Sequence, residues 1–339
     1  MNLLRIVVLS LAGIVAAPAW SQAYPSKPVR VVVTFPPGGT PDIYGRIMAA
    51  ELAKAWNQSV VVENRTGAGG TIGTDSVGKS APDGYTLLFA ADASITIAPH
   101  LYSKLPYDPV RDFAPIVNVA AGPFVMLAHP SFPANNVAEM IALARANPGK
   151  YSYASSGAGG QQHLAMETVR SMTGIDLVHI PYKGFGQGIA DVLANQVPLI
   201  FGGITASISL IKAGKVKGLG VTSPQRSKAL PDVPAIAETL PGFDIQAWYG
   251  FMAPAGTPRD IVLKIHDDVV TIIKRPDFQE RLAKDAIEPV ANSPEAFAAQ
   301  IKTDLGRWAK VVKAAGAGQR ARPLLPRGEI GRASCRERV

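Results

Sequence analysis

Residues 29–42 read Val-Arg-Val-Val-Val-Thr-Phe-Pro-Pro-Gly-Gly-Thr-Pro-Asp. The β-branched residues at 29–35, bounded by prolines, predict a buried strand. The Pro-Pro-Gly-Gly run predicts a turn. Thr40-Pro41-Asp42 is then typical of a helix start, with Thr40 as the N-cap, proline at the first helical position and an acid in the first turn. A strand therefore passes through a glycine turn directly into a helix.

The same order recurs along the chain, in two blocks separated by a long apolar passage at 113–129. Alternating strands and helices predict an α/β fold with mostly parallel sheets and helices on both faces. A length of 339 residues suggests about two domains. We expect strands at 29–35, 60–63, 85–90, 151–155, 177–182, 197–202, 216–222 and 245–253, and helices at 40–56, 71–80, 137–146, 207–213, 258–274, 278–285 and 294–315, with two further helices ending at 173 and 194.

The first residues have the layout of a secretory signal peptide. Arg5 precedes an apolar run at 6–17, and Ser21-Gln22-Ala23 supplies small residues three and one before a cut. A run of this length is shorter than the ~20 residues that span a membrane. We expect cleavage after Ala23 and a periplasmic protein.

The last residues, 317–339, are Arg-rich and have no apolar period, and they resemble a translated sequencing adapter more than a native terminus. Together with Arg5 they carry five of the eight net positive charges, which leaves about +3 for the body and no argument for nucleic-acid binding. The only cysteine, Cys335, lies in this tail. We therefore expect no disulfide, no metal site and no cofactor.

Glycine-rich turns follow four of the expected strands, at 38–39, 67–70, 157–160 and 184–188. Unpaired backbone N–H groups and the dipole at a helix start favour an anion, and glycine lets a ligand approach the backbone closely. In open α/β sheets ligands bind at the carboxyl ends of the strands, where these turns fall. Glycine turns can also simply connect strands to helices. Four of them, shared between two blocks, favour an anion held in a cleft.

No nucleophile elbow, dinucleotide fingerprint or zinc helix is present in the sequence. His163 lies near Ser155 and Ser156, so a Ser–His pair is conceivable, but a histidine that hydrogen-bonds ligand or backbone is the better interpretation. Asp42 in a first helical turn is interpreted first as a capping acid and second as a ligand contact.

Five stretches resemble one known family. Residues 35–42 with Arg46 resemble the first ligand loop of the Bug-type solute-binding proteins, the extracytoplasmic receptors of tripartite tricarboxylate transporters. Residues 63–70 resemble their second loop, and residues 82–87, 179–184 and 230–234 resemble three later signatures. The resemblance spans Tyr24 to about Gly316.

The resemblance implies a two-lobed periplasmic binding protein of the Venus-flytrap, type II-like class. Lobe one would comprise 24–122 plus 224–316 and lobe two 123–223, with hinge segments around 119–124 and 222–224. A small carboxylate would be held largely by main-chain N–H groups from both lobes. The implied ligand-binding residues are Pro37, Gly38, Gly39, Thr40, Asp42, Ser94, Ser155, Ser156, Gly157, Gly159, Gly160, His163, Tyr182, Lys183 and Gly184.

The function expected from this resemblance is that of a monomeric receptor, not an enzyme, which delivers a small organic carboxylate to membrane subunits of a transporter. The ligand could be a dicarboxylate, a tricarboxylate, an acidic amino acid or an aromatic acid. One alternative is a sensing component that presents the closed form to a sensor kinase. Another is a secreted serine esterase that uses Ser155 or Ser156 with His163.

Overall fold

A computed structural model describes residues 24–35, 37–182 and 184–316. The expected cleavage after Ala23, the tail at 317–339 and the candidate ligand residue Lys183 lie outside these ranges. Among the described helices none is long and apolar enough to span a bilayer.

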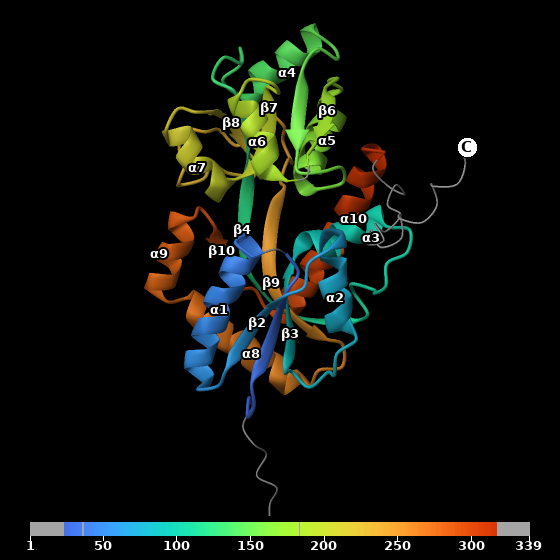
Figure 1. The fold of residues 1–339 in the computed structure, drawn as a ribbon, viewed down its shortest axis with the longest axis vertical. Coiled ribbons are helices and arrows are strands. Elements are labelled where there is room, and N and C mark those ends of the chain that lie inside the picture. The colour runs from blue at the N-terminus through green and yellow to red at the C-terminus, as the bar shows by residue number, and fades with distance from the viewer. Residues whose placement is uncertain (1–23, 36, 183, 317–339) are drawn as a thin grey trace, which may run out of the picture.

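The lower lobe in Figure 1, lobe one, is built on a mixed sheet. Strands β1 (Val29–Val33), β2 (Val60–Asn64) and β3 (Thr86–Ala91) are parallel, with β1 in the middle. Strand β9 (Gln246–Pro254) continues the sheet antiparallel to β3. The first part of β4 (Phe113–Ala128) pairs with β9, and the short β10 (Glu288–Pro289) pairs with β4. The parallel half places the carboxyl ends of β1, β2 and β3 at one edge.

Lobe two, above it, repeats this plan with fewer strands. Strands β5 (Ser152–Ser155), β6 (Val178–Pro181) and β7 (Leu199–Gly203) are parallel. The last part of β4 and strand β8 (Lys217–Val221) complete the sheet, with β4 antiparallel to both β7 and β8. The α/β two-lobed fold is thus confirmed, and in each lobe parallel strands share the sheet with β4.

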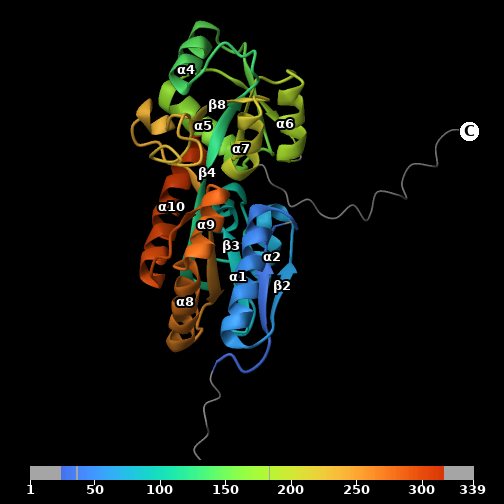
Figure 2. The same ribbon diagram turned by 90° about the vertical axis from the view of Figure 1, so that its left-hand side faces the viewer.

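Strand β4 is one continuous strand of 16 residues that belongs to both lobes. Its residues up to Pro123 pair with β9, and those from Phe124 onward pair with β7 and β8. Figure 2 shows it passing from one lobe to the other. The returning chain is fastened to it at Thr222, whose N–H donates to the Phe124 carbonyl at 2.9 Å while its hydroxyl accepts the Phe124 N–H at 2.7 Å.

Helices cover both faces of each sheet (Figures 1 and 2). Those of lobe one are α1 (Thr40–Trp56), α2 (Thr71–Gly78), α3 (Ala98–Leu101), α8 (Arg259–Ile273), α9 (Pro276–Lys284) and α10 (Pro294–Ala314). Those of lobe two are α4 (Val137–Ala146), α5 (Gln161–Thr173), α6 (Phe185–Leu193) and α7 (Ile204–Lys212). One apolar core runs through both lobes along β4, from Phe89 and Phe251 to Met126, Tyr153 and Phe201.

Four local features differ from the sequence analysis. The glycine-rich turn expected at 184–188 is reduced to its first residue, because α6 already begins at Phe185. Thr40 is the first helical residue of α1 and Gly39 is the N-cap, because Gly39 takes the extended conformation. The segment after β3, where the sequence analysis placed no element, forms a π-helical turn (Ala93–Ile97) and α3. The apolar passage at 113–129 forms a single strand, β4, that is shared by two sheets. The pattern of its residues gives no sign of the change from one sheet to the other.

Gly250 is a point where the sheet of lobe one tolerates no side chain. A Cβ there would lie 2.7 Å from both the Val117 carbonyl oxygen and Phe297 Cζ. The carbonyl belongs to β4, which is paired with β9, and cannot move away. We expect Gly250→Ala to lower the free energy of unfolding by roughly 1–3 kcal/mol in urea titrations.

Gly306→Ala is the matched control for that variant. Gly306 is exposed in the interior of α10 and a Cβ there would meet nothing within 4 Å. The gain in helix propensity should raise stability by about 0.5–1 kcal/mol. Equal effects of the two substitutions would contradict the close β4–β9 packing.

Candidate functional site

The first loop of lobe one, between β1 and α1, is tied down by Asp42. This carboxylate is 4% exposed and accepts the Gly38 N–H on Oδ2 at 2.9 Å. Its Oδ1 accepts Asn64 Nδ2 at 2.7 Å and Arg46 Nε at 2.9 Å. Burial acts to raise the Asp42 pKa, but these hydrogen bonds prevail and the pKa is lowered. Asp42 therefore fastens the loop, which leaves Gly39 and Thr40 half-buried at the start of α1.

Residues after β3 and in the second glycine turn pack closely around the end of β1, next to this loop. Ser94 is fully buried and donates to the Ala91 carbonyl at 3.1 Å. A Cβ on Gly70, in the second glycine turn, would lie 3.1 Å from Ser94 Cβ and from Thr34 Oγ1. Only a glycine lets that turn approach the end of β1 so closely. Ser94 thus has a packing role in the described structure, and Pro37 lies exposed at the tip of the first loop.

The loop of lobe two connects β5 to α5. Gly157 and Gly159 both take positive φ angles, +132° and +81°, so the loop needs glycine at these points. Ser156 donates its hydroxyl to Gln162, and the Tyr182 N–H donates to the Ser155 carbonyl at 2.9 Å. The Tyr182 hydroxyl donates to Asp191 Oδ2 at 2.5 Å, which raises its pKa to about 12 and turns the hydroxyl toward α6.

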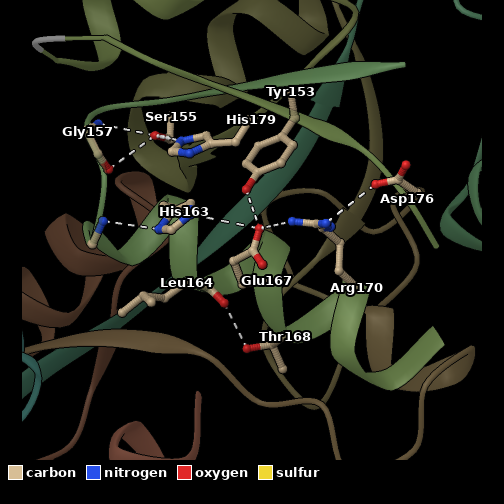
Figure 3. Close-up of polar contacts among 11 residues, drawn as sticks. Tyr153, Ser155, Gly157, His163, Leu164, Glu167, Thr168, Arg170, Asp176 and His179 are labelled. Carbon is tan, nitrogen blue, oxygen red and sulfur yellow. Dashed lines mark hydrogen bonds and ion pairs between the residues drawn. The ribbon is translucent and has the colours of Figure 1, made fainter. Parts of the chain in front are cut away.

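Under this loop three rings form a stack (Figure 3). His179 lies between Tyr153 and His163, with ring centroids 4.9 Å and 4.0 Å away. His179 Nε2 is 2.6 Å from Ser155 Oγ, and His163 Nδ1 accepts the Gly159 N–H at 3.1 Å. Each imidazole therefore supports one end of the loop from below.

Glu167 anchors the other side of the stack. Its Oε1 accepts the Tyr153 hydroxyl at 2.6 Å and Arg170 Nη1 at 2.7 Å, and it lies 3.8 Å from His163 Nε2. Because Nδ1 of His163 accepts a backbone N–H, its proton is assigned to Nε2, which faces the carboxylate.

Both imidazoles are neutral at neutral pH. Burial lowers the pKa of His163, and burial together with the adjacent His163 lowers that of His179 to about 4. The two rings thus serve as uncharged hydrogen-bonding supports.

Away from the strand crossing, two side-chain hydrogen bonds between described residues connect the lobes. Gln161, the first residue of α5, donates from Nε2 to Asp92 Oδ2 at 2.6 Å, and Thr205 Oγ1 donates to the Asp285 carbonyl at 2.6 Å. Asp92 also lies near Tyr249, which in turn lies near Thr40. This succession of neighbours places the first loop of lobe one and the start of α5 in lobe two together at the boundary between the lobes, which we call the seam.

The proposed pairing of Ser155 or Ser156 with His163 is wrong. Ser155 contacts His179, Ser156 contacts Gln162, and Nδ1 of His163 is occupied by the Gly159 N–H. The serine–histidine pair that does form is Ser155 with His179. Ser155 is fully buried, and its Oγ also lies 3.2 Å from both the backbone nitrogen and the carbonyl oxygen of Gly157. The described residues contain no group of three or more potential metal ligands.

Three residues of the site escaped the sequence argument: His179, Gln161 and Asp92. The register of β5 and β6, which sets Tyr153 opposite His179, brings this histidine under the loop. Asp92 directly follows the expected strand at 85–90, at the sheet edge where the glycine turns were found. Attention to acids at that edge would have singled it out.

The comparisons with known proteins agree on one family. Residues 44–317 match the family model described as "Tripartite tricarboxylate transporter family receptor". Protein BugT of Bordetella pertussis is 34% identical over 94% of this chain and 99% of its own length. The solved structure of the periplasmic binding protein BugD is 37% identical, covers 87% of this chain and 99% of its own, and superposes with a TM-score of 0.75.

Two further solved structures carry ligands. The R. palustris protein Rpa4515 with adipate is 33% identical with a TM-score of 0.78, covering 86% of this chain and 98% of its own. MatC of Rhodopseudomonas palustris with bound malate is 31% identical with a TM-score of 0.74, covering 85% of this chain and all of its own. The chain belongs to the tripartite tricarboxylate transporter receptor family, whose members include the Bug proteins, and has the periplasmic binding protein fold.

The lowered pKa of His179 predicts a loss of stability in acid. An unfolded histidine takes up its proton near pH 6.5, whereas the folded residue resists protonation until about pH 4. Stability is therefore full above pH 6.5 and falls as the pH drops from 6.5 to 4. Allowing for the partial exposure of the ring, we expect a loss of about 1–2 kcal/mol in urea titrations.

His179→Gln should remove much of that slope, because glutamine keeps a hydrogen-bonding group near Ser155 and does not titrate. His129→Gln is the control, since the His129 ring bonds Ser131 on the surface of the same lobe. If His129→Gln flattens the profile as much as His179→Gln does, the stack is not the source of the acid sensitivity.

Proposed function

We propose that this protein is a periplasmic receptor that captures a small organic carboxylate between its lobes and delivers it to the membrane subunits of a tripartite tricarboxylate transporter. The observation that carries the proposal is the pair of glycine-capped helix starts at the seam. The N-caps of α1 and α5 are Gly39 and Gly160, and neither helix start is capped by a side chain.

Such helix starts are suited to an anion. Their first-turn N–H groups have no partner within the helix, and the helix dipole places positive potential there. A carboxylate accepts several such bonds, and charge-assisted hydrogen bonds are about twice as strong as neutral ones. A body of about +3 can in this way bind an anion without an arginine clamp. The ligands of Rpa4515 and MatC, adipate and malate, are carboxylates, which supports the same class here.

The proposed ligand contacts come from the loops already described. In lobe one they are Gly38, Gly39 and Thr40, with Pro37 and Ser94 beside them and Asp42 holding the loop. In lobe two they are Ser155, Ser156, Gly157, Gly159, Gly160 and His163, with Tyr182 and Gly184 after β6. Lys183, which lies outside the described residues, is included on the sequence resemblance alone. Of these residues, six act by positioning the loops, because their side-chain polar atoms are hydrogen-bonded within the chain: Asp42, Ser94, Ser155, Ser156, His163 and Tyr182.

Binding would be coupled to closure about the β4 crossing. A ligand that touches both lobes does so only in the closed state, so it increases the population of that state. We propose hinges at 119–124 and 222–224, where β4 changes partners and Thr222 is bonded to Phe124. The membrane subunits would then distinguish closed from open receptors. The protein would act as a monomer after cleavage at Ala23.

A thermal-shift screen tests the carboxylate site. The protein is freed of co-purified ligand by unfolding and refolding, and is then heated with small dicarboxylates, tricarboxylates, amino acids and aromatic acids. A ligand at 100 times its Kd should stabilise the fold by about 2.7 kcal/mol, on the order of 5 °C for a chain of this size. A folded protein that responds to no carboxylate would contradict the proposed function.

Gly159→Val and Gly174→Val separate the site from the fold. Both glycines have positive φ, +81° and +70°, and they flank opposite ends of α5. Valine at 159 would crowd Leu101 of lobe one, whose Cδ1 atom would lie 3.0 Å from the new Cβ, whereas at 174 it meets nothing within 4 Å. We expect similar backbone strain in both variants and loss of the ligand-induced shift only in Gly159→Val.

A further inference from the structure

Asp92 is a buried carboxylate with an unused oxygen at the junction of the lobes. It follows β3 and is 1% exposed. Its Oδ2 accepts Gln161 Nε2 from lobe two at 2.6 Å, and its Oδ1 is buried without a hydrogen-bond partner among the described residues. None of the loop-positioning interactions described above uses this oxygen.

The electrostatic surroundings of Asp92 are negative. Burial raises the Asp92 pKa well above its ordinary range, and the Asp304 carboxylate of α10 raises it further. Among the described residues the cation that opposes them is Arg307, which already donates to Asp304 Oδ1 at 2.9 Å and to the Asp244 carbonyl at 2.5 Å. The uncharged neighbours are Gln161 on α5, Tyr249 on β9 and the backbone N–H groups of Asp92 and Ala93, which favour the ionised carboxylate but do not satisfy Oδ1.

Closing the lobes without a ligand therefore carries a cost. In an open state water can solvate both oxygens of Asp92, whereas in the closed state one of them has no donor. An unsatisfied buried acceptor is destabilising, and a buried charge more so. A ligand group that donates a hydrogen bond and carries positive charge would relieve both, and only in the closed state. A second carboxylate at that point would instead face Asp92 and Asp304.

We propose that Asp92 is an ammonium-binding residue of the cleft and that the ligand is an amino acid, held by its carboxylate at the glycine-capped helix starts and by its amino group at Asp92. This inference rests on the proposed function and narrows its ligand class. It makes Asp92 a specificity-determining residue, since plain carboxylic acids leave its free oxygen unsatisfied.

The test compares amino acids with the acids that lack only the amino group. Calorimetric titrations of the ligand-free protein would use aspartate and succinate, glutamate and glutarate, and phenylalanine and 3-phenylpropionate. We expect the amino acid of the recognised pair to bind on the order of tenfold to a hundredfold more tightly, the effect of one hydrogen bond to a charged group. Asp92→Asn should abolish that preference while retaining the des-amino acid.

Asp83→Asn is the matched control, because Asp83 lies on an exposed turn of lobe one beside Lys27. It should leave the preference unchanged. Equal affinity within every pair in the wild-type protein would overturn the ammonium site while leaving the carboxylate receptor intact. Binding of no member of any pair would overturn both proposals.

Proton linkage gives a second readout that needs no variant. An ammonium group pairs with the ionised Asp92, which is already ionised when water solvates it in the open state, so binding near neutral pH should take up no proton and the affinity should fall only when the pH is low enough to protonate the open-state carboxyl. Titrations in buffers of different ionisation enthalpy measure the number of protons exchanged. Proton uptake would mean that Asp92 is protonated and donates to the ligand, which would overturn the proposal.

Discussion

Strand β4 belongs to two sheets at once, and this sharing determines how the two lobes are related. Its first part is paired with β9 and β10 and its last part with β7 and β8. The apolar core follows it without a break. Under the proposed closure, relative movement would be concentrated where the strand changes partners between Pro123 and Phe124, and there Phe124 and Thr222 bond each other through both main chain and side chain. The same geometry brings the glycine turns of both lobes to one seam.

The loops at this seam are flexible by composition but are held firmly from beneath. In lobe one the Asp42 carboxylate binds Gly38, Asn64 and Arg46. In lobe two the stacked imidazoles of His163 and His179 bond Gly159 and Ser155. Glycine provides the close approach and the positive φ angles, and the buried polar side chains remove the conformational freedom that glycine brings. A loop that is already ordered loses less entropy when a ligand binds.

The sequence predicted the elements better than their interactions. Helices α1 and α4 span the expected residues, since their apolar periods are local signals, although the N-cap of α1 is Gly39 and not Thr40. The dual role of 113–129 could not be predicted, because a strand that changes partners has the same local pattern as any buried strand. Three of the four glycine turns were predicted correctly from chain order alone, whereas residues 185–188 of the fourth belong to α6. The Ser155–His179 contact and the Asp92–Gln161 bond depend on the β5–β6 register and on how the lobes meet, and neither is encoded in nearby residues.

Small-angle X-ray scattering of the full chain, with and without a saturating ligand, tests the central claim that binding closes two lobes about β4. The account predicts that the radius of gyration falls on ligand addition, because closure of the cleft brings the two lobes closer together. It also predicts that the change is smaller in Gly159→Val at the same ligand concentration. An unchanged radius of gyration, in a sample shown by calorimetry to be saturated, would contradict closure as the response to the ligand.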